Sequence, residues 1–129
     1  MPLIVVGDFN SGPNSVAGDG SPRTLSYQAM LAAGYTDVWT LRPQPDRSGN
    51  TCCHAADLSN VLPELEQRID LLLTRNVDEL GPSSGRENAQ VWLVGDVVRD
   101  RRWAGLWPSD HAGVLGRMVF PNPIRVAND

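Results

Sequence analysis

Short apolar runs separated by polar, turn-rich segments predict most of the strands in this chain. Residues 3–6 form a β-branched run that ends at Gly7, a pattern typical of a buried strand. Residues 68–74 are apolar enough to form a central strand. Residues 90–98 and 113–120 predict two further strands near the end of the chain.

One segment, residues 24–33, has the pattern of a helix. It begins with a threonine, and helical spacing places Leu25, Ala29 and Ala32 on one face. Gly34 follows directly and suits the end of a helix, because glycine tolerates the left-handed conformation found there. We therefore expect a single helix between the first strand and the rest of the chain.

The other segments are predicted to be irregular. Residues 37–39 and 51–53 predict short extended pieces, and the tail 121–129 is expected to be frayed. Residues 57–66 have apolar positions at helical spacing, but Pro63 interrupts them, so we expect a loop with at most one helical turn. Loops are also expected at residues 11–22, 42–50, 76–88 and 99–109.

This order of elements predicts the fold class. A strand, a helix and an irregular crossover are followed by three strands with little helix between them, which indicates an α/β protein of the α+β type. We expect one mixed, mostly antiparallel sheet with the helix on one face only. Residues 69–73 and 91–94 are apolar on both strand faces, so the sheet needs a second layer that the sequence does not obviously supply.

Composition limits the class of protein. A chain of 129 residues with 41% hydrophobic and 20% charged residues has the size and composition of one soluble globular domain. The net charge of −4 argues against broad nonspecific attachment to nucleic acid or anionic lipid. No apolar run could span a membrane, and residues 1–6 lack the features of a signal peptide, so localisation stays open.

Basic residues concentrate in one loop only. All eleven basic residues are arginines, and three of them, Arg99, Arg101 and Arg102, lie close to Trp103 and Trp107. The loop is either a solvated surface segment anchored by its tryptophans or a loop that faces a substrate.

The two cysteines, Cys52 and Cys53, are adjacent. A disulfide between neighbours is expected to be badly strained, so the sequence argues against one. Alternation along a strand would instead direct one thiol into the core and the other outward. His54 follows directly, and a metal or redox site completed by this histidine is the alternative.

Polar residues with chemical potential interrupt the apolar segments at three places. Asp8 and Asn10 follow the first strand, Asp70 lies in the central one, and Asp110 and His111 precede the last. A carboxylate can accept a proton or bind a hard cation, and an amide can donate to an oxyanion. Oxygen donors with few sulfur or nitrogen donors favour Mg²⁺ or Mn²⁺ over zinc.

These segments together resemble a known family. The sequences LIVVGDFN at 3–10, GYTDVW at 34–39, QRIDLLL at 67–73 and WPSDH at 107–111 are similar to the C-terminal half of the endonuclease/exonuclease/phosphatase superfamily. The resemblance covers about residues 2–120 and implies that residues 1–120 form half of a four-layer α/β/β/α sandwich. The stretch at 51–53 also resembles a bacterial subgroup of this superfamily.

The resemblance implies a function and a role for each matched residue. The function is divalent-metal-dependent hydrolysis of a phosphate ester, with Mg²⁺ or Mn²⁺ as cofactor and a substrate class that the sequence does not reveal. Asp8 would orient or deprotonate the attacking water, and Asn10 would hold the phosphate. Asp70 would pair with His111, which would stabilise charge on the phosphoryl oxygens. Asp110 and Asp8 would lie at the metal. Leu71 departs from the family, where an aromatic residue often follows the aspartate.

The resemblance also implies that something is missing. In this superfamily the metal-binding glutamate and an early asparagine come from an N-terminal half, and we expect that nothing before Leu3 provides either residue. The alternative to an enzyme is therefore a non-catalytic, truncated fragment or a half-domain that needs a partner. That partner would be the N-terminal half or a second copy bound through an uncovered sheet face. A remote alternative is a serine hydrolase that uses Ser83, because residues 81–85 match G-x-S-x-G and precede Asp110 and His111.

Overall fold

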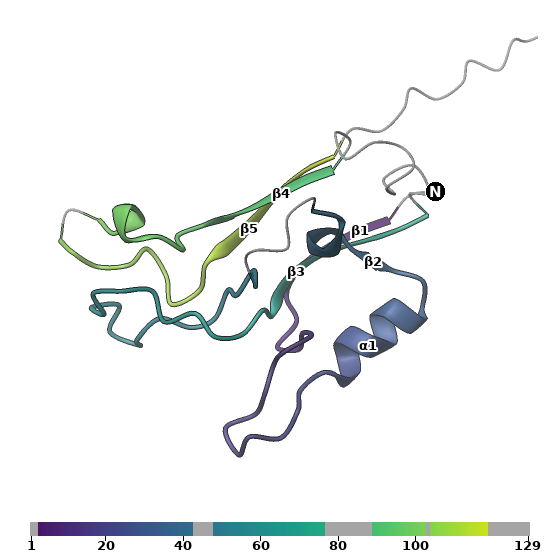
Figure 1. Ribbon diagram of the computed structural model, residues 1–129, viewed down its shortest axis with the longest axis horizontal. Coiled ribbons are helices and arrows are strands. Elements are labelled where there is room, and N and C mark those ends of the chain that lie inside the picture. Colours follow the sequence, from purple (N-terminus) through teal and green to yellow (C-terminus); the bar gives the residue numbers. More distant parts are fainter. Residues whose placement is uncertain (1–2, 43–47, 77–88, 103, 119–129) are drawn as a thin grey trace, which may run out of the picture.

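The chain is a mixed α+β structure, and the strand pairs among its described residues are antiparallel. The computed structural model describes residues 3–42, 48–76, 89–102 and 104–118 (Figure 1). Its elements, in chain order, are β1 (Leu3–Asp8), α1 (Leu25–Ala32), β2 (Thr36–Asp37), η1 (Val38–Leu41), β3 (Asp70–Arg75), β4 (Ala89–Val94), η3 (Val98–Asp100) and β5 (Gly113–Met118).

The strands of the described residues form two sheets, where the sequence predicted one. The first sheet has the order β1-β3-β2, with β3 in the centre as expected, and the second is the β4-β5 hairpin. Leu73 of β3 has no exposed surface, which is consistent with its place in the central strand.

The two faces of β3 pack against different elements. Leu71 and Leu73 point to one face and form a buried cluster with Tyr27 of α1. Leu72 points to the opposite face and packs against Val91 of β4. Figure 1 shows the same arrangement, with α1 on one side of β3 and the β4-β5 hairpin on the other. The hairpin therefore supplies part of the second layer that the sequence did not reveal.

This second layer does not reach β1. Val6 pairs with Leu72 and Ile4 with Thr74, so both side chains point to the face that carries Leu72. Ile4 is 46% exposed and Val6 is 63% exposed. The prediction of a buried first strand is therefore wrong, because β1 lies at the edge of its sheet and only one of its faces is covered.

The helix has the predicted extent but a different packing face. It covers Leu25–Ala32, and Gly34 follows it with a positive φ of 84°. Leu25 is 79% exposed, however, and Tyr27 is the residue that the helix buries. The helix therefore buries its aromatic residue rather than the predicted aliphatic face, because the large Tyr27 ring packs against Leu71.

The remaining predictions are confirmed in part. The extended piece expected at 37–39 is β2, which ends at Asp37 before η1 begins at Val38. The strand expected at 90–98 ends at Val94. Residues 57–66 contain no helix. The predicted tail at 121–129, the proposed boundary at residue 120 and Ser83 lie outside the described residues.

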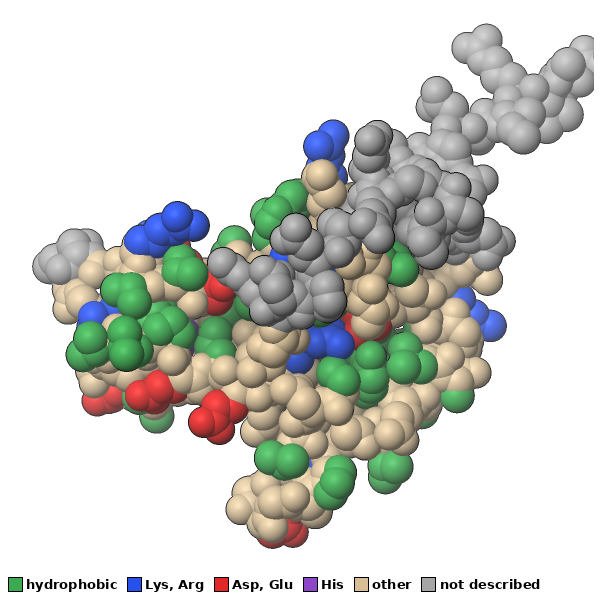
Figure 2. All heavy atoms as spheres, in the orientation of Figure 1, with side chains coloured by type: hydrophobic (Ala, Val, Ile, Leu, Met, Phe, Trp, Pro, Cys, Tyr) green, Lys and Arg blue, Asp and Glu red, His purple; other side chains and the backbone are tan. Residues whose placement is uncertain are grey.

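Two loops meet at one end of the molecule. The backbone N–H of Trp107 donates to the carbonyl oxygen of Leu58 (3.0 Å), and its indole Nε1 donates to the carbonyl oxygen of Asn60 (2.7 Å). Figure 2 shows hydrophobic side chains at the left-hand end of the molecule, where these loops lie. Trp107 is therefore a buried anchor of the arginine-containing loop, as one of the two sequence readings expected.

No helix among the described residues is long and apolar enough to cross a membrane.

Candidate active site

A carboxylate–imidazole pair forms where two strands begin. Asp70 opens β3, and His111 lies two residues before β5. Nδ1 of His111 is 2.7 Å from Oδ2 of Asp70, and the two side chains are 25% and 19% exposed. This contact fixes the orientation of the imidazole and leaves its Nε2 free to face other groups. The structure thus brings together two of the residues singled out in the sequence.

The segment around Thr51 holds the two halves of this pair in place. Cys52 forms antiparallel bridges with both Gln67 and His111, which brings the chain before β3 close to the chain before β5. The buried hydroxyl oxygen of Thr51 accepts hydrogen bonds from the backbone N–H groups of Ile69 (3.2 Å) and Asp70 (3.0 Å). Residues 51–52 are therefore the connection that positions Asp70 and His111, a role that no local sequence signal reveals.

Asp8 and Asn10 lie on the adjacent edge strand and its exit. Asp8 pairs directly with Asp70, so their side chains point to the same face of the sheet. The carboxylate of Asp8 accepts hydrogen bonds from the backbone N–H of Asn10 (2.7 Å) and from its side-chain amide (3.2 Å). Asn10 has a φ of 48°, a left-handed conformation that asparagine tolerates better than most residues. Both side chains are exposed and accessible to a ligand.

The described residues do not assemble a carboxylate cage for Mg²⁺. Within them, no three acidic side chains come close enough together to share a cation. Asp110 is exposed, and its carboxylate accepts a bond from the hydroxyl of Ser109 (3.3 Å). Its backbone carbonyl accepts from the N–H of His54 (2.7 Å). A hard cation prefers several oxygen ligands, so Asp8 and Asp110 alone do not fit this requirement.

The cysteines lie beside His111. The structure joins Cys52 and Cys53 in a disulfide across a cis peptide bond, which contradicts the expectation that neighbours would not pair. Cys52 is buried and Cys53 is exposed, but their sulfurs lie together, so the expectation that one thiol points inward and the other outward is also wrong. Sγ of Cys53 lies 3.7 Å from Nε2 of His111. The Nδ1 side of the imidazole therefore faces a carboxylate, and its Nε2 side faces a sulfur.

His54 does not take part in this cluster. Its ring stacks on Trp107 with centroids 3.9 Å apart and an interplanar angle of 12°. Nε2 is 3.2 Å from the carbonyl oxygen of Gly95, and Nδ1 is 3.2 Å from Nδ2 of Asn60. The metal or redox site considered for Cys52, Cys53 and His54 is therefore wrong in its histidine, because His111 occupies that position.

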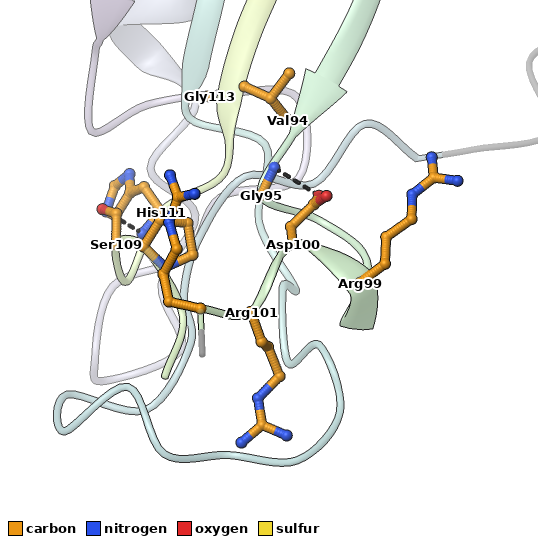
Figure 3. Close-up of a pocket in the computed structure, with 10 residues that line it drawn as sticks. Val94, Gly95, Arg99, Asp100, Arg101, Ser109, His111 and Gly113 are labelled. Atoms are coloured by element: carbon orange, nitrogen blue, oxygen red, sulfur yellow. Dashed lines mark hydrogen bonds between the residues drawn. The ribbon is translucent and has the colours of Figure 1, made fainter. Parts of the chain in front are cut away.

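A pocket of about 480 Å³ opens beside His111. Its lining includes Ser109 and His111 together with all three arginines of the loop, Arg99, Arg101 and Arg102. In Figure 3 the side chains of Arg99 and Arg101 extend away from His111. Arg101 also donates through Nη2 to the carbonyl oxygen of Gly105. The loop thus lines the pocket, while Arg99 and Arg101 do not point at the imidazole.

An ion pair much more buried than the Asp70–His111 contact begins at Arg68, two residues before Asp70. Nη1 of Arg68 is 2.6 Å from Oδ2 of Asp37, with side chains 6% and 2% exposed. The hydroxyl of Tyr27 donates to the same oxygen (2.9 Å). Burial, and then the charge of Asp37, raise the pKa of Tyr27 above its ordinary value. This network joins α1, β2 and the start of β3, and its role is structural.

The comparison with known proteins does not assign the chain to a family. No family model matches the sequence, and no curated protein or solved structure matches it.

Proposed function

We propose that this chain carries part or all of the active site of a divalent-metal-dependent phosphoester hydrolase. Among such enzymes we favour a phosphodiesterase. The observation that carries the proposal is the Asp70–His111 contact of 2.7 Å beside the Asp8–Asn10 pair. These are the four residues to which the family resemblance assigned catalytic roles. Membership of the endonuclease/exonuclease/phosphatase superfamily, and the four-layer sandwich that it implies, belong to the same proposal.

Each side chain has a task that its geometry allows. Asp70 holds the His111 ring through Nδ1, so that Nε2 can contact a phosphoryl oxygen and stabilise the charge that develops there. Asp8 lies on the same face and can orient or deprotonate a water molecule. The amide of Asn10 would leave Asp8 to donate to a phosphate oxygen.

The proposed cofactor is Mg²⁺ or Mn²⁺, which the family resemblance implies. When bound, such a cation would neutralise charge on the phosphate. Asp8 and Asp110 are the residues that would contact it, and its other ligands would have to come from outside the described residues.

The pocket beside His111 supports a phosphate ester as the substrate. A ligand there would meet the imidazole on one side and the arginine-containing loop on the other. Arginine side chains recognise phosphate oxygens through several N–H donors at once. Arg102 is exposed and lines the pocket, so its guanidinium could contact a bound phosphate.

A partner-dependent half-domain without activity of its own is the second candidate. The exposed Ile4 and Val6 favour it, because they lie on the same sheet face as Asp8 and Asp70. Covering them with an N-terminal half or a second copy would bury apolar surface directly beside the site.

The test is turnover of a chromogenic phosphodiester with and without Mg²⁺ or Mn²⁺. We expect metal-dependent hydrolysis that a chelator stops and that the variants Asp8→Asn and His111→Gln lose. The matched control is Asp57→Asn, the same change in an exposed turn outside the site. Metal-dependent turnover that survives in both site variants would contradict the proposal. Activity that appears only at high protein concentration, and that Val6→Glu abolishes, would favour the half-domain.

A further inference from the structure

We propose that Cys52, Cys53 and His111 form a zinc site once the disulfide between the two cysteines is reduced. The three side chains are the group of potential metal ligands that the described residues bring together, with all ligand atoms within 4.8 Å of one another. The donors are two sulfurs and one imidazole nitrogen, a set that favours zinc over the hard cations Mg²⁺ and Mn²⁺.

The distance between the two exposed donors fits zinc. Zinc–sulfur and zinc–nitrogen bonds of about 2.3 and 2.05 Å at a tetrahedral angle separate the sulfur and nitrogen by about 3.6 Å. Sγ of Cys53 and Nε2 of His111 are 3.7 Å apart. One edge of the coordination tetrahedron is therefore already present, and only the second sulfur has to move when the S–S bond opens.

The surroundings of His111 are those of a zinc-bound histidine. Such a histidine usually donates its other ring N–H to a carboxylate, which fixes the tautomer and increases the basicity of the ligand nitrogen. Asp70 occupies this place, 2.7 Å from Nδ1 of His111. In the tautomer that donates its Nδ1 proton to Asp70, Nε2 presents its lone pair toward Cys53.

The backbone also favours a preformed site. Cys52 is bridged directly to His111, so the cysteine pair and the histidine cannot drift apart without breaking these main-chain contacts. Cys52 is buried while Cys53 is exposed and His111 is partly exposed, so an ion can enter from one side. Three protein ligands would leave the fourth position to water.

Formation of the site requires an external reductant. A phosphine reduces the S–S bond and is itself oxidised to a phosphine oxide, which takes its oxygen from one water molecule. The two protons of that water are transferred to the two sulfurs, which become thiols. Zinc then binds both sulfurs as thiolates, which releases two protons to solvent. The oxidised chain offers no thiolate and should not form the site.

The site shares His111 with the proposed hydrolase. If that function is correct, zinc would occupy Nε2 of His111 and inhibit the reduced enzyme while sparing the oxidised one. This consequence rests on the proposed function, whereas the binding of zinc does not.

The experiment measures zinc binding directly, by competition of the full chain with a chromogenic chelator. Protein reduced with a phosphine, which avoids the chelating dithiols, is compared with oxidised protein. We expect one zinc per reduced chain and none per oxidised chain. Co²⁺ in place of zinc should give the absorption of cobalt–thiolate bonds in the reduced chain only. Equal binding by both forms, or none by the reduced form, overturns the proposal without any variant.

Single variants then identify the ligands. Cys53→Ser and His111→Gln should abolish tight binding, and Asp70→Asn should weaken it by about 10- to 100-fold. Asp57→Asn, in an exposed turn outside the site, is the matched control, and it should bind zinc like the unmodified chain. Binding that survives His111→Gln, or that Asp57→Asn removes, overturns the proposed ligand set. These results stand whether or not the chain hydrolyses a phosphodiester.

Discussion

Two contacts between a carboxylate and a nitrogen base flank one short stretch of chain, and they differ chiefly in burial. Arg68 and Asp37 are 6% and 2% exposed, whereas His111 and Asp70 are 25% and 19% exposed. Their shortest contacts are nearly equal, at 2.6 and 2.7 Å. The first pair is closed by a third partner, Tyr27, while Nε2 of the second faces an exposed sulfur.

The difference shows that motif membership does not decide the role of a residue. Arg68 and Asp70 belong to one motif, yet Arg68 connects elements in the interior and Asp70 orients an accessible imidazole. A buried pair has no room for substrate, and breaking it leaves an uncompensated charge in a region of low dielectric. A half-buried pair contributes little to stability, so one of its side chains can contact a substrate at a low cost in free energy.

The largest effect is expected from breaking the buried pair. Asp37→Ala leaves the guanidinium of Arg68 buried without its carboxylate and also removes the acceptor of Tyr27. We expect a loss of about 3–5 kcal/mol in the free energy of unfolding, measured by urea denaturation. Asp57→Asn, in an exposed turn, should change it by less than about 0.5 kcal/mol. If Asp37→Ala and Asp57→Asn lost equal free energies of unfolding, burial would not explain the importance of the Arg68–Asp37 pair.

A smaller loss of stability, with a large loss of activity, is expected at the second pair. His111→Gln removes the partly exposed contact with Asp70, which should cost about 0.5–1.5 kcal/mol. Hydrolysis of a phosphodiester should fall by about 100-fold or more, because the imidazole then no longer stabilises the phosphoryl charge. Parallel urea titrations and turnover measurements separate the two effects. A variant that loses stability like Asp37→Ala but keeps its activity would contradict the assignment.

Local sequence patterns predicted some of this fold. The helix at 24–33 and the central strand at 68–74 were found because periodicity and capping residues act over a few positions. The buried face of the helix was not, because which side chain packs depends on the β3 residues beneath it. Exposure of β1 also escaped detection, since an edge strand has the same apolar composition as a central one.

The candidate site was predicted only as far as its motifs extend. Asp70 and His111 were paired in advance, and their contact is confirmed. The position of Cys53 against the same imidazole was missed, because the two residues are 58 positions apart and no local signal connects them. His54 was considered instead because it is adjacent in sequence, but the chain turns it into a stack with Trp107.

The pH dependence of the free energy of unfolding should reveal the contribution of Tyr27 to the buried network. Its pKa is raised in the folded chain, so the folded state holds the phenolic proton more tightly than the unfolded state does. The associated stability is complete below about pH 10, the ordinary tyrosine pKa, and is lost as the pH rises through the higher folded value. Tyr27→Phe should cost about 1 kcal/mol at neutral pH and should reduce this alkaline loss.

Urea denaturation between pH 8 and pH 11 measures that dependence. Tyr35→Phe, at the other of the two tyrosines, is the matched control and should keep the alkaline loss of the unmodified chain. If Tyr27→Phe declines with pH as steeply as the unmodified chain, the buried network does not hold the phenolic proton.

The smallest change in stability is expected at Asn10, next to the site. Its left-handed backbone suits glycine, so Asn10→Gly keeps the turn and removes only the amide that bonds Asp8. The free energy of unfolding should change by less than about 0.5 kcal/mol, whereas Asn10→Ala should cost about 1 kcal/mol through backbone strain. Both variants should lose phosphodiester hydrolysis equally, since both lack the donor to phosphate. If Asn10→Gly keeps full activity, the amide serves the turn alone and belongs, like Arg68, to the structural part of the molecule.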